Sequence, residues 1–209
     1  MDVRQQRSQS LLFAAALRLA AATPVGSLSA TAIAREAGVH RSTFYELANS
    51  PADLVERALR AELDDLRAEL LAGLVVDADA DADADAGAGL DEAVTAVTRG
   101  VLEHVRRHAE TYRRGLAEDS GVASLHPLLA RHFRETSRLL GDRAGLRVDL
   151  AVAGLDDGRV EDTAIHFVCA GTVGAIQAWL GTDELDVDGF LALYLRLVPA
   201  WWPHVRSLD

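Results

Sequence analysis

The sequence predicts an all-α protein. Ala, Leu, Arg, Asp and Glu dominate it, aromatic residues make up only 5%, and the chain contains only five prolines. Alternating β-branched residues, which are typical of half-buried strands, are scarce. At 209 residues the chain is long enough to bury a sizeable core. We expect three short helices, a connecting fourth helix and five more helices.

The first three helices are predicted near the N-terminus. Apolar residues recur at helical spacing up to Ala22, and Thr23-Pro24-Val25-Gly26 cannot continue that helix. Ser29 is a good N-cap for a second helix, and Gly38 follows where a left-handed backbone usually ends one. The three helices are therefore expected over 10–22, 29–37 and 40–47.

A longer helix and an acidic loop are predicted next. Asn49-Ser50-Pro51 supplies a cap and a proline at the first helical position, so a helix is expected from Pro51 to about Leu71. Residues 77–89 hold five Asp-Ala pairs and then Gly-Ala-Gly. Their carboxylates repel one another and leave no apolar face, which predicts a solvated loop between two domains. Calcium binding is an alternative, although the terminal Glu and central Gly of a calcium loop are missing.

Five helices are predicted after the acidic loop, because apolar residues again recur at helical spacing. Pro199 and Pro203 are expected to bend or end the last of them. Residues 141–158 are rich in Gly and Asp and are expected to form a loop. The five helices are expected over 90–108, 109–117, 126–140, 160–180 and 187–202.

The charge of the chain is uneven. The net charge is -11, but residues 1–60 hold seven Arg against five acidic residues, and the chain has no lysine. The N-terminal end is therefore mildly basic, as a DNA-binding segment requires. One cysteine cannot form an intramolecular disulfide, and neither a secretory leader nor an uncharged apolar run of about 18 residues is present. We expect a cytoplasmic protein with no membrane partner.

Residues 28–45 fit a helix-turn-helix. Such a motif needs small residues where two short helices cross, a tight turn, an apolar underside and an outward polar face. The same pattern also fits an ordinary helical hairpin with a solvated face, and the residue types alone leave both readings open. Ala34 and Ala37 are the small residues, Gly38 makes the turn, Ile33, Val39 and Phe44 form the underside, and His40, Arg41, Ser42 and Thr43 face outward.

This stretch resembles the TetR family of transcriptional regulators. The family motif I-A-x-x-A-G-V-x-x-x-T-h-Y stands here as Ile33-Ala34, Ala37-Gly38-Val39 and Thr43-Phe44-Tyr45. The resemblance is strong in sequence over about 10–66 and covers the whole chain in architecture. It implies a helix-turn-helix domain over 1–50 and a helical domain for effector binding and dimerisation over 51–209.

The resemblance implies which residues contact operator DNA. Arg4 and Arg7, in an N-terminal arm, are expected either to add phosphate contacts or to remain solvated. The family commonly has an aromatic residue and a lysine where this chain has Ala48 and Pro51, so we expect weaker electrostatic affinity. Backbone N–H groups at the start of the fourth helix can still face DNA. The implied DNA contacts are Ser29, Thr31, His40, Arg41, Ser42, Thr43 and Tyr45.

The last two helices are expected to form a homodimer. Small residues on one side of the penultimate helix allow a second helix to approach closely, and the family pairs these helices across a two-fold axis. Tight packing within one chain is the alternative. The expected interface comprises Phe167, Gly171, Gly174, Ala175, Ala178, Leu191, Tyr194 and Trp202.

The effector site is expected among the intervening helices, where Arg, His and Tyr could hold an anionic or aromatic effector. The alternative is that most of these residues are surface groups. Metal sensing is a second reading, because His104 and His108 stand at i and i+4 on one helical face and could bind a metal together with His132 or a carboxylate. A histidine pair on a solvent-facing stripe needs no metal, so we expect neither metal nor cofactor. Cys169 is expected to be a buried, inert thiol. The candidate ligand residues are His104, Arg107, His108, Tyr112, His132 and Phe133.

The expected function is a small-molecule-responsive regulator, by resemblance a repressor, and not an enzyme. Effector binding would shift the fourth helix and change the separation of the two recognition helices. A helical dimer that has lost specific DNA binding is one alternative, for which the acidic charge and the missing lysine are the reasons. An enzyme with a His and carboxylate site is another, but no phosphate loop, nucleophile elbow or paired-carboxylate motif supports it.

Overall fold

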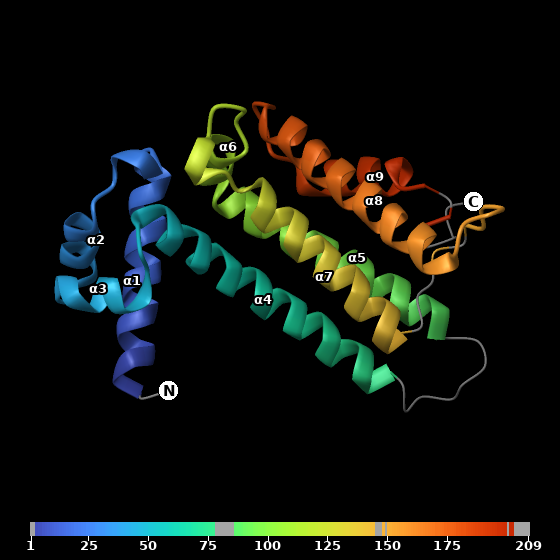
Figure 1. Cartoon of the computed structure of the whole chain (residues 1–209), viewed down its shortest axis with the longest axis horizontal. Coiled ribbons are helices and arrows are strands. Elements are labelled where there is room, and N and C mark those ends of the chain that lie inside the picture. Colours follow the sequence, from blue (N-terminus) through green and yellow to red (C-terminus); the bar gives the residue numbers. More distant parts are fainter. Residues whose placement is uncertain (1–2, 78–85, 145–147, 149, 200, 203–209) are drawn as a thin grey trace. The chain divides into compact units, whose positions relative to one another are not determined.

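The computed structural model describes residues 3–77, 86–144, 148, 150–199 and 201–202. Those residues form nine α-helices and two short 3-10 helices and contain no strand, which confirms the predicted all-α class (Figure 1). The chain divides into two compact units. Residues 1–63 and 107–128 form the first, and residues 64–106 and 129–209 form the second.

The units do not follow the expected boundary after residue 50. The acidic segment 77–89 is flanked on both sides by residues of the second unit, so it does not connect the two units. The boundaries instead fall inside helices, because α4 (Pro51–Asp77) and α5 (Ala86–Arg107) each contribute residues to both units. The functional division into 1–50 and 51–209 stays a prediction.

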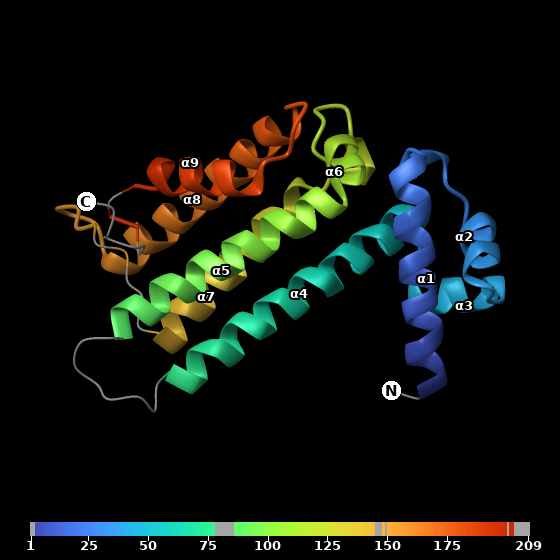
Figure 2. The same cartoon turned by 180° about the vertical axis from the view of Figure 1, so that it is seen from behind.

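The first unit contains the predicted short helices. These are α1 (Val3–Ala22), α2 (Ala30–Ala37) and α3 (Arg41–Leu47), joined by η1 (Val25–Ser27) and followed by the first part of α4, by α6 (Ala109–Gly115) and by η2 (Gly121–Ala123). In both ribbon views α2 and α3 lie beside α1 (Figures 1 and 2). The core of this unit includes Leu12, Ala15, Ile33, Phe44, Leu54, Leu59, Tyr112 and Leu116.

Local signals define the two ends of α2. The Ser29 hydroxyl oxygen accepts a hydrogen bond from the Ala32 backbone N–H at 3.1 Å, which satisfies one of the free donors of the first turn. Gly38 has φ +65°, a left-handed conformation that residues with a Cβ rarely adopt. The N-cap and C-cap predicted from the sequence are both confirmed.

An arginine ties α6 to the end of α1. Arg114 Nη1 donates to the carbonyl oxygens of Ala20 at 2.9 Å and Ala21 at 3.3 Å. The last carbonyls of a helix have no partner within the helix, so a guanidinium placed there satisfies them and complements the negative end of the helix dipole. This contact lies within the first unit.

The second unit is a helical bundle. It contains the rest of α4, most of α5, α7 (His126–Ala144) from Leu129 onward, α8 (Asp157–Leu180) and α9 (Val187–Leu197). Asp156 and Asp186 cap α8 and α9 by accepting from Arg159 N and Gly189 N. The Trp179 ring stacks on Phe190 with 4.9 Å between centroids, which joins α8 to α9. The core includes Val101, Leu102, Val105, Leu129, Ile165, Val173, Ile176 and Leu191.

Several helix ends differ from the predictions. α1 begins at Val3 rather than residue 10, so Arg4 and Arg7 belong to an exposed helical stretch and not to an extended arm. α5 begins at Ala86, so Gly87 and Gly89 are helical rather than part of a loop, and the neighbouring alanines favour that helix. Pro199 ends α9 at Leu197, earlier than expected, because it lacks an N–H and restricts Val198 to an extended backbone. Residues 78–85 of the Asp-Ala segment lie outside the described residues.

α8 has the length and apolar composition that a membrane-spanning helix requires, the only such case among the described helices. Half of that stretch is buried inside the chain, which also fits an ordinary core helix.

Candidate DNA-binding surface and effector cavity

α3 presents a polar surface supported by an apolar underside. Arg41, Ser42 and Tyr45 are exposed and Thr43 is half-buried, whereas Phe44 is fully buried. On α2, Ile33, Ala34 and Ala37 are buried beneath the same surface. The two helices therefore have the packing that the sequence predicts for a helix-turn-helix.

Arg41 and Tyr45 contact each other one turn apart. Arg41 Nη2 donates to the Tyr45 hydroxyl oxygen at 2.8 Å, and the guanidinium carbon lies 5.2 Å from the centre of the Tyr45 ring. The ring also packs edge-on against Phe44 at 5.3 Å. A guanidinium and a phenol held on the exposed face of a short helix can reach base edges and phosphates.

Two other predicted DNA contacts have local structural roles. His40 is the N-cap of α3, because its Nδ1 accepts from Ser42 N at 3.3 Å, and the same nitrogen lies 2.9 Å from the Ser42 hydroxyl. Ser29 caps α2. Both residues, like Thr31, are exposed. A contact with DNA at His40 or Ser29 would therefore be made by a side chain that already fixes the start of a helix.

The start of α4 carries an acidic group that the sequence analysis did not weigh. Ser50 Oγ accepts from Asp53 N at 3.1 Å, while Asp53 Oδ2 accepts from Asn49 N at 2.9 Å. Arg57 donates to Asp53 at 2.7 Å, and this hydrogen bond is the main reason that the pKa of Asp53 is lowered. The carboxylate is ionised and accepts from the backbone N–H of Asn49, just before α4, while the Asp53 N–H at the start of α4 donates to Ser50. The start of α4 thus lacks the lysine that the family commonly has at the position of Pro51, and it carries the negative charge of Asp53 as well.

A cavity of about 110 Å³ lies within the second unit, between α7, α8 and α9. Most of its wall is apolar, and hydroxyls, a thiol and one carboxylate add polar groups. These belong to Thr98, Thr136, Ser137, Glu161, Cys169, Thr172 and Tyr194. The Thr172 hydroxyl lies 3.0 Å from the Tyr194 hydroxyl, which links α8 to α9 across the wall. The remaining lining residues are Phe133, Leu140, Val148, Ile165, Val168, Leu195, Val198 and Trp202.

Cys169 is a neutral component of this wall. The residue is 2% exposed, and burial raises the pKa of its thiol to about 11, although Ser137, Arg134 and Arg138 act in the opposite direction. The thiol is therefore protonated at neutral pH, as a weak nucleophile. An inert thiol was expected at this position, but its place at a cavity was not.

The structure places the candidate ligand residues of the second unit in different surroundings. Phe133 lines the cavity, whereas His104 and His132 are buried and do not appear among its lining residues. Burial, followed by the charges of Arg67 and His104, lowers the pKa of His132 to about 3. His132 is therefore neutral at physiological pH, which removes one expected cationic partner for an anionic effector.

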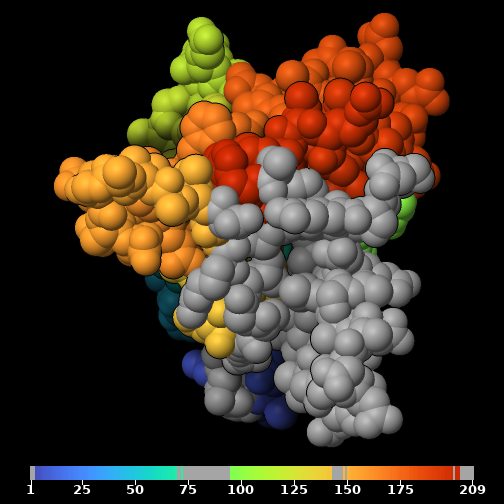
Figure 3. Space-filling model, turned by 90° about the vertical axis from the view of Figure 1, so that its right-hand side faces the viewer, coloured from blue at the N-terminus to red at the C-terminus, as the bar shows by residue number. Residues whose placement is uncertain are grey.

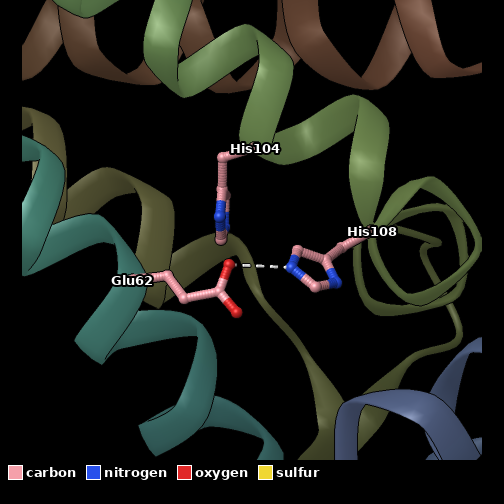
Figure 4. Close-up of side chains that lie close together, drawn as sticks. All are labelled: Glu62, His104 and His108. Atoms are coloured by element: carbon pink, nitrogen blue, oxygen red, sulfur yellow. Dashed lines mark hydrogen bonds and ion pairs between the residues drawn. The ribbon is translucent and has the colours of Figure 1, made fainter. Parts of the chain in front are cut away.

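The other candidate ligand residues belong to the first unit. His108 Nε2 lies 2.9 Å from a carboxylate oxygen of Glu62 (Figure 4). Arg107 Nη1 donates to the same oxygen at 3.3 Å. Tyr112 is fully buried, and burial with the nearby Glu62 charge raises its pKa well above the usual range. Arg107, His108 and Tyr112 thus stand around one carboxylate in a unit that does not contain the cavity.

A second cavity of about 550 Å³ lies within the first unit, between η1, the start of α4, α6 and η2. Thr111 lines it, and the Thr111 hydroxyl is buried without a hydrogen-bond partner. Gly115 also lines it, where a Cβ would lie 2.5 Å from the Leu125 side chain. No sequence signal pointed to this cavity.

α8 and α9 present an apolar face to solvent. Phe167 is 66% exposed, and Leu193 and Leu197 on α9 are exposed as well. A Cβ added at Gly171 or Gly174 would meet nothing within 4 Å. Figure 3 shows α9, in red, lying against α8, in orange. Among the other expected interface residues, Ala178 is exposed, Ala175, Tyr194 and Trp202 are half-buried, and Leu191 belongs to the core of its own chain.

Solved structures of transcription regulators resemble this chain. FadR from Thermus thermophilus, a TetR family repressor in complex with lauroyl-CoA, is 18% identical with a TM-score of 0.58, covering 96% of this chain and 97% of that one. A TetR regulator from Rhodococcus sp. RHA1 is 18% identical with a TM-score of 0.55, covering 94% and 98%. The multidrug binding protein EbrR, complexed with imidazole, is 24% identical with a TM-score of 0.51, covering 96% and 97%.

No protein-family model matches the chain, and no curated protein matches its sequence. The likeness to solved structures extends over nearly the whole chain, and at these identities it shows a shared fold.

Proposed function

We propose that this chain, which has the fold of the TetR-family regulators, is a cytoplasmic homodimeric repressor that binds operator DNA through α3 and is released by a small molecule. The observation that carries this proposal is the surface of α3, where Arg41 and Tyr45 are held side by side on a helix with a buried underside. α3 is the second helix of the helix-turn-helix, and its exposed Arg and Tyr side chains could contact base edges and phosphates in a DNA major groove. Thr31 and Ser42 add hydroxyls to this surface, and both are exposed.

The homodimer is supported by the apolar face of α8 and α9. Large side chains such as Phe167 and Leu193 are more than half exposed in the single chain, and burying them stabilises a pair of chains at roughly 25 cal/mol per Å². Gly171 and Gly174 leave room for a partner helix to approach closely. A two-fold axis would place the second recognition helix on a second half-site about 34 to 36 Å away.

The effector would occupy the cavity between α7, α8 and α9. Its wall is mostly apolar with a few convergent polar groups, which is the usual character of a small-molecule site. α4 contributes residues to both units, so a ligand that changes helix packing in the second unit has a continuous helix through which to act on the first. An effector that binds the released state more tightly shifts the population away from DNA.

A helical dimer without specific DNA binding is a second candidate, favoured by the Asp53 carboxylate at the start of α4. A catalytic function has no comparable support, because the thiol in the cavity wall is protonated and a weak nucleophile at neutral pH.

Selection of bound duplexes from a random-sequence pool tests the proposal and separates the two candidates. The repressor predicts recovery of a palindromic sequence whose half-sites lie one helical turn apart. Tyr45→Ala should recover none. Recovery of no consensus by the wild-type protein would favour the dimer without specific DNA binding.

A further inference from the structure

The cavity of the first unit is bounded by segments that hold one another in place. Leu125 N donates to the Gly115 carbonyl oxygen at 2.7 Å, and a Cβ at Gly115 would lie 2.5 Å from the Leu125 side chain, so this approach needs a glycine. Arg114, which also lines the cavity, ties α6 to the Ala20 and Ala21 carbonyls at the end of α1. The cavity is therefore formed before a ligand binds, as small-molecule sites usually are.

The size and position of this cavity suit a small molecule. Its volume of about 550 Å³ falls within the usual range for such sites, about 300–1,000 Å³. Apolar side chains, among them Val25, Val55 and Leu125, contribute to the wall. η1 precedes α2 and α4 follows α3, so a molecule in the cavity would touch the chain on both sides of the helix-turn-helix.

The Thr111 hydroxyl differs from the other helical threonine hydroxyls of the chain. Thr111 is 2% exposed, and its Oγ1 is buried with no hydrogen-bond partner among the residues that the structure describes. Thr136, Thr163 and Thr172 instead donate to the carbonyl four residues earlier. Thr111 lies in the first turn of α6, and the residue four positions earlier is Arg107, the last residue of α5. The usual acceptor of a helical threonine therefore lies outside its own helix.

A ligand can supply the missing partner of Thr111. A hydroxyl carries one donor and two lone pairs, so it can bond to either kind of polar group. Threonine in a helix populates two χ1 rotamers, so this hydroxyl can turn toward a molecule in the cavity that Thr111 lines. A buried hydroxyl without a partner is destabilising, and a ligand group that bonds to it removes that penalty. Ser120 and Ser124 add further hydroxyls to the wall.

The formal charges of the wall cancel. Each arginine of the wall has a carboxylate partner in Glu110, and Glu56 pairs with Arg60. Asp119 is exposed to solvent, where an ion pair contributes little. A charged molecule would lose hydration and gain at most that solvated carboxylate, so the wall favours an uncharged molecule. The charged lining residues are Glu56, Arg113, Arg114 and Asp119.

We infer that the cavity of the first unit is a second small-molecule site, separate from the cavity of the second unit, for an uncharged ring compound with a polar group that bonds to the Thr111 hydroxyl. A cavity of about 150 Å³ holds benzene, so about 550 Å³ admits two fused rings. The cancelled charges favour a neutral molecule, and Thr111 orients it. The inference goes beyond the proposed function and does not depend on DNA binding.

The test uses three probes that share a naphthalene ring and differ in charge. 2-Naphthylmethanol is uncharged, 2-naphthoate is an anion and 2-naphthylmethylammonium is a cation. Titration calorimetry with the full-length protein, in the absence of DNA, measures the three affinities. The wild-type protein should bind 2-naphthylmethanol at least about tenfold more tightly than either charged probe, because neither ion gains a partner that compensates for its lost hydration.

Thr111→Val tests the hydroxyl. It should weaken 2-naphthylmethanol about three- to tenfold without lowering the free energy of unfolding of the unliganded protein, because the hydroxyl has no partner there. Thr172→Val is the matched control, since Thr172 is also buried but lines the cavity of the second unit, and its hydroxyl bonds to Val168 and Tyr194. It should lower the free energy of unfolding and leave the affinity for 2-naphthylmethanol unchanged.

Gly26→Trp tests the position of the probe in the first unit. Gly26 lines the cavity, and an added Cβ there would meet nothing within 4 Å, so the larger side chain should weaken 2-naphthylmethanol at least about tenfold by competing for the space. Ser27→Trp is the matched control, because Ser27 is exposed on the same 3-10 helix and does not line the cavity. Its affinity should equal that of the wild type.

Four results would each overturn the inference. They are a wild-type protein that does not bind 2-naphthylmethanol, a charged probe that binds as tightly, weakening by Thr172→Val but not by Thr111→Val, and unchanged affinity in both Thr111→Val and Gly26→Trp. The third result would place the probe in the cavity of the second unit and support the effector site proposed there. Failure to recover an operator sequence would overturn the proposed function alone, because these titrations contain no DNA.

Discussion

Arg41 Nη2 and the Tyr45 hydroxyl oxygen are 2.8 Å apart, so the only arginine of α3 is held against the tyrosine one turn later. The guanidinium also lies over the tyrosine ring, which limits its rotamers before any DNA is bound. A guanidinium has five N–H donors, and this contact uses one of them. Arg41 can therefore keep its position and still offer paired donors to a guanine edge.

Arg41→Ala should weaken binding to a selected operator by about 10- to 100-fold, because a bidentate contact with a base is worth about 1–3 kcal/mol. The loss should be much smaller on non-specific DNA. Arg18→Ala is the matched control, since Arg18 is an exposed arginine of the same unit that pairs with Glu36 at 3.1 Å. Fluorescence anisotropy on both duplexes measures the effect, and equal losses for the two variants would remove Arg41 from base recognition.

Ser29 has a structural role and a predicted DNA contact, and two substitutions separate them. Ser29→Ala loses the hydrogen bond to Ala32 N and should lower the free energy of unfolding by about 1 kcal/mol. Ser29→Asp keeps a capping oxygen and should match the wild-type stability, but its charge should reduce DNA affinity at least tenfold. Urea unfolding and DNA titration give the two quantities. Wild-type DNA affinity for Ser29→Asp would show that Ser29 lies away from DNA.

Gly38→Ala should destabilise the protein by about 1–2 kcal/mol through backbone strain alone. The position has φ +65° but enough space, because an added Cβ would meet nothing within 4 Å. Gly26→Ala has the same free space without a left-handed backbone and should have little effect. Urea unfolding of both variants checks the difference, and equal stabilities would mean that the turn relaxes out of the left-handed region.

His132 should make stability depend on pH between about 3 and 6.5. The pKa of His132 is about 3 in the folded protein and about 6.5 in the unfolded chain, so the unfolded chain binds the extra proton in this window. The free energy of unfolding therefore falls as pH falls, by about 2 kcal/mol between pH 7 and pH 5 from this group.

His132→Leu should remove that part of the slope. His166→Leu, at an exposed position, should leave the slope unchanged. The measurement is urea unfolding at several pH values. A slope for His132→Leu equal to that of the wild type would mean that the imidazole is not buried in its neutral form.

Phe167→Asp should convert the proposed dimer to monomers, because it places a charge on the exposed apolar face of α8. Val122→Asp is the control, since Val122 is 98% exposed on η2, which belongs to the other unit. Sedimentation velocity at micromolar concentration distinguishes the species. A wild-type protein that is already monomeric, or a Phe167→Asp variant that stays dimeric, would contradict the proposed interface.

The sequence predicted the elements whose signals are local. The Ser29 cap and the left-handed Gly38 fix α2 through neighbours only a few residues away, so their residue types were enough. The motif from Ile33 to Tyr45 could also be predicted from nearby residues, because the helices that cross and the buried residues beneath them belong to two helices adjacent in sequence. Helix ends without a strong start or stop signal were harder to predict. α5 begins at Ala86 and includes Gly87 and Gly89, which were expected to lie in a loop.

The cavity could not be predicted, because its wall depends on tertiary packing. Thr172 and Tyr194 are 22 residues apart and meet only when α8 packs on α9. The histidine-rich pattern suggested polar ligand groups, but burial determines their charge, as the lowered pKa of His132 makes clear. The hydroxyls that do line the cavity are too common in sequence to stand out.

The most direct test of the central claim is a titration of the full-length protein against its selected operator and a scrambled duplex of equal length, across a salt series, with Tyr45→Ala beside the wild type. The regulator should bind the operator at least about 1,000-fold more tightly than the scrambled duplex, lose affinity as salt rises, and lose its preference in Tyr45→Ala. Equal affinities for the two duplexes at every salt concentration, unchanged in Tyr45→Ala, would contradict it and leave a helical dimer with no operator.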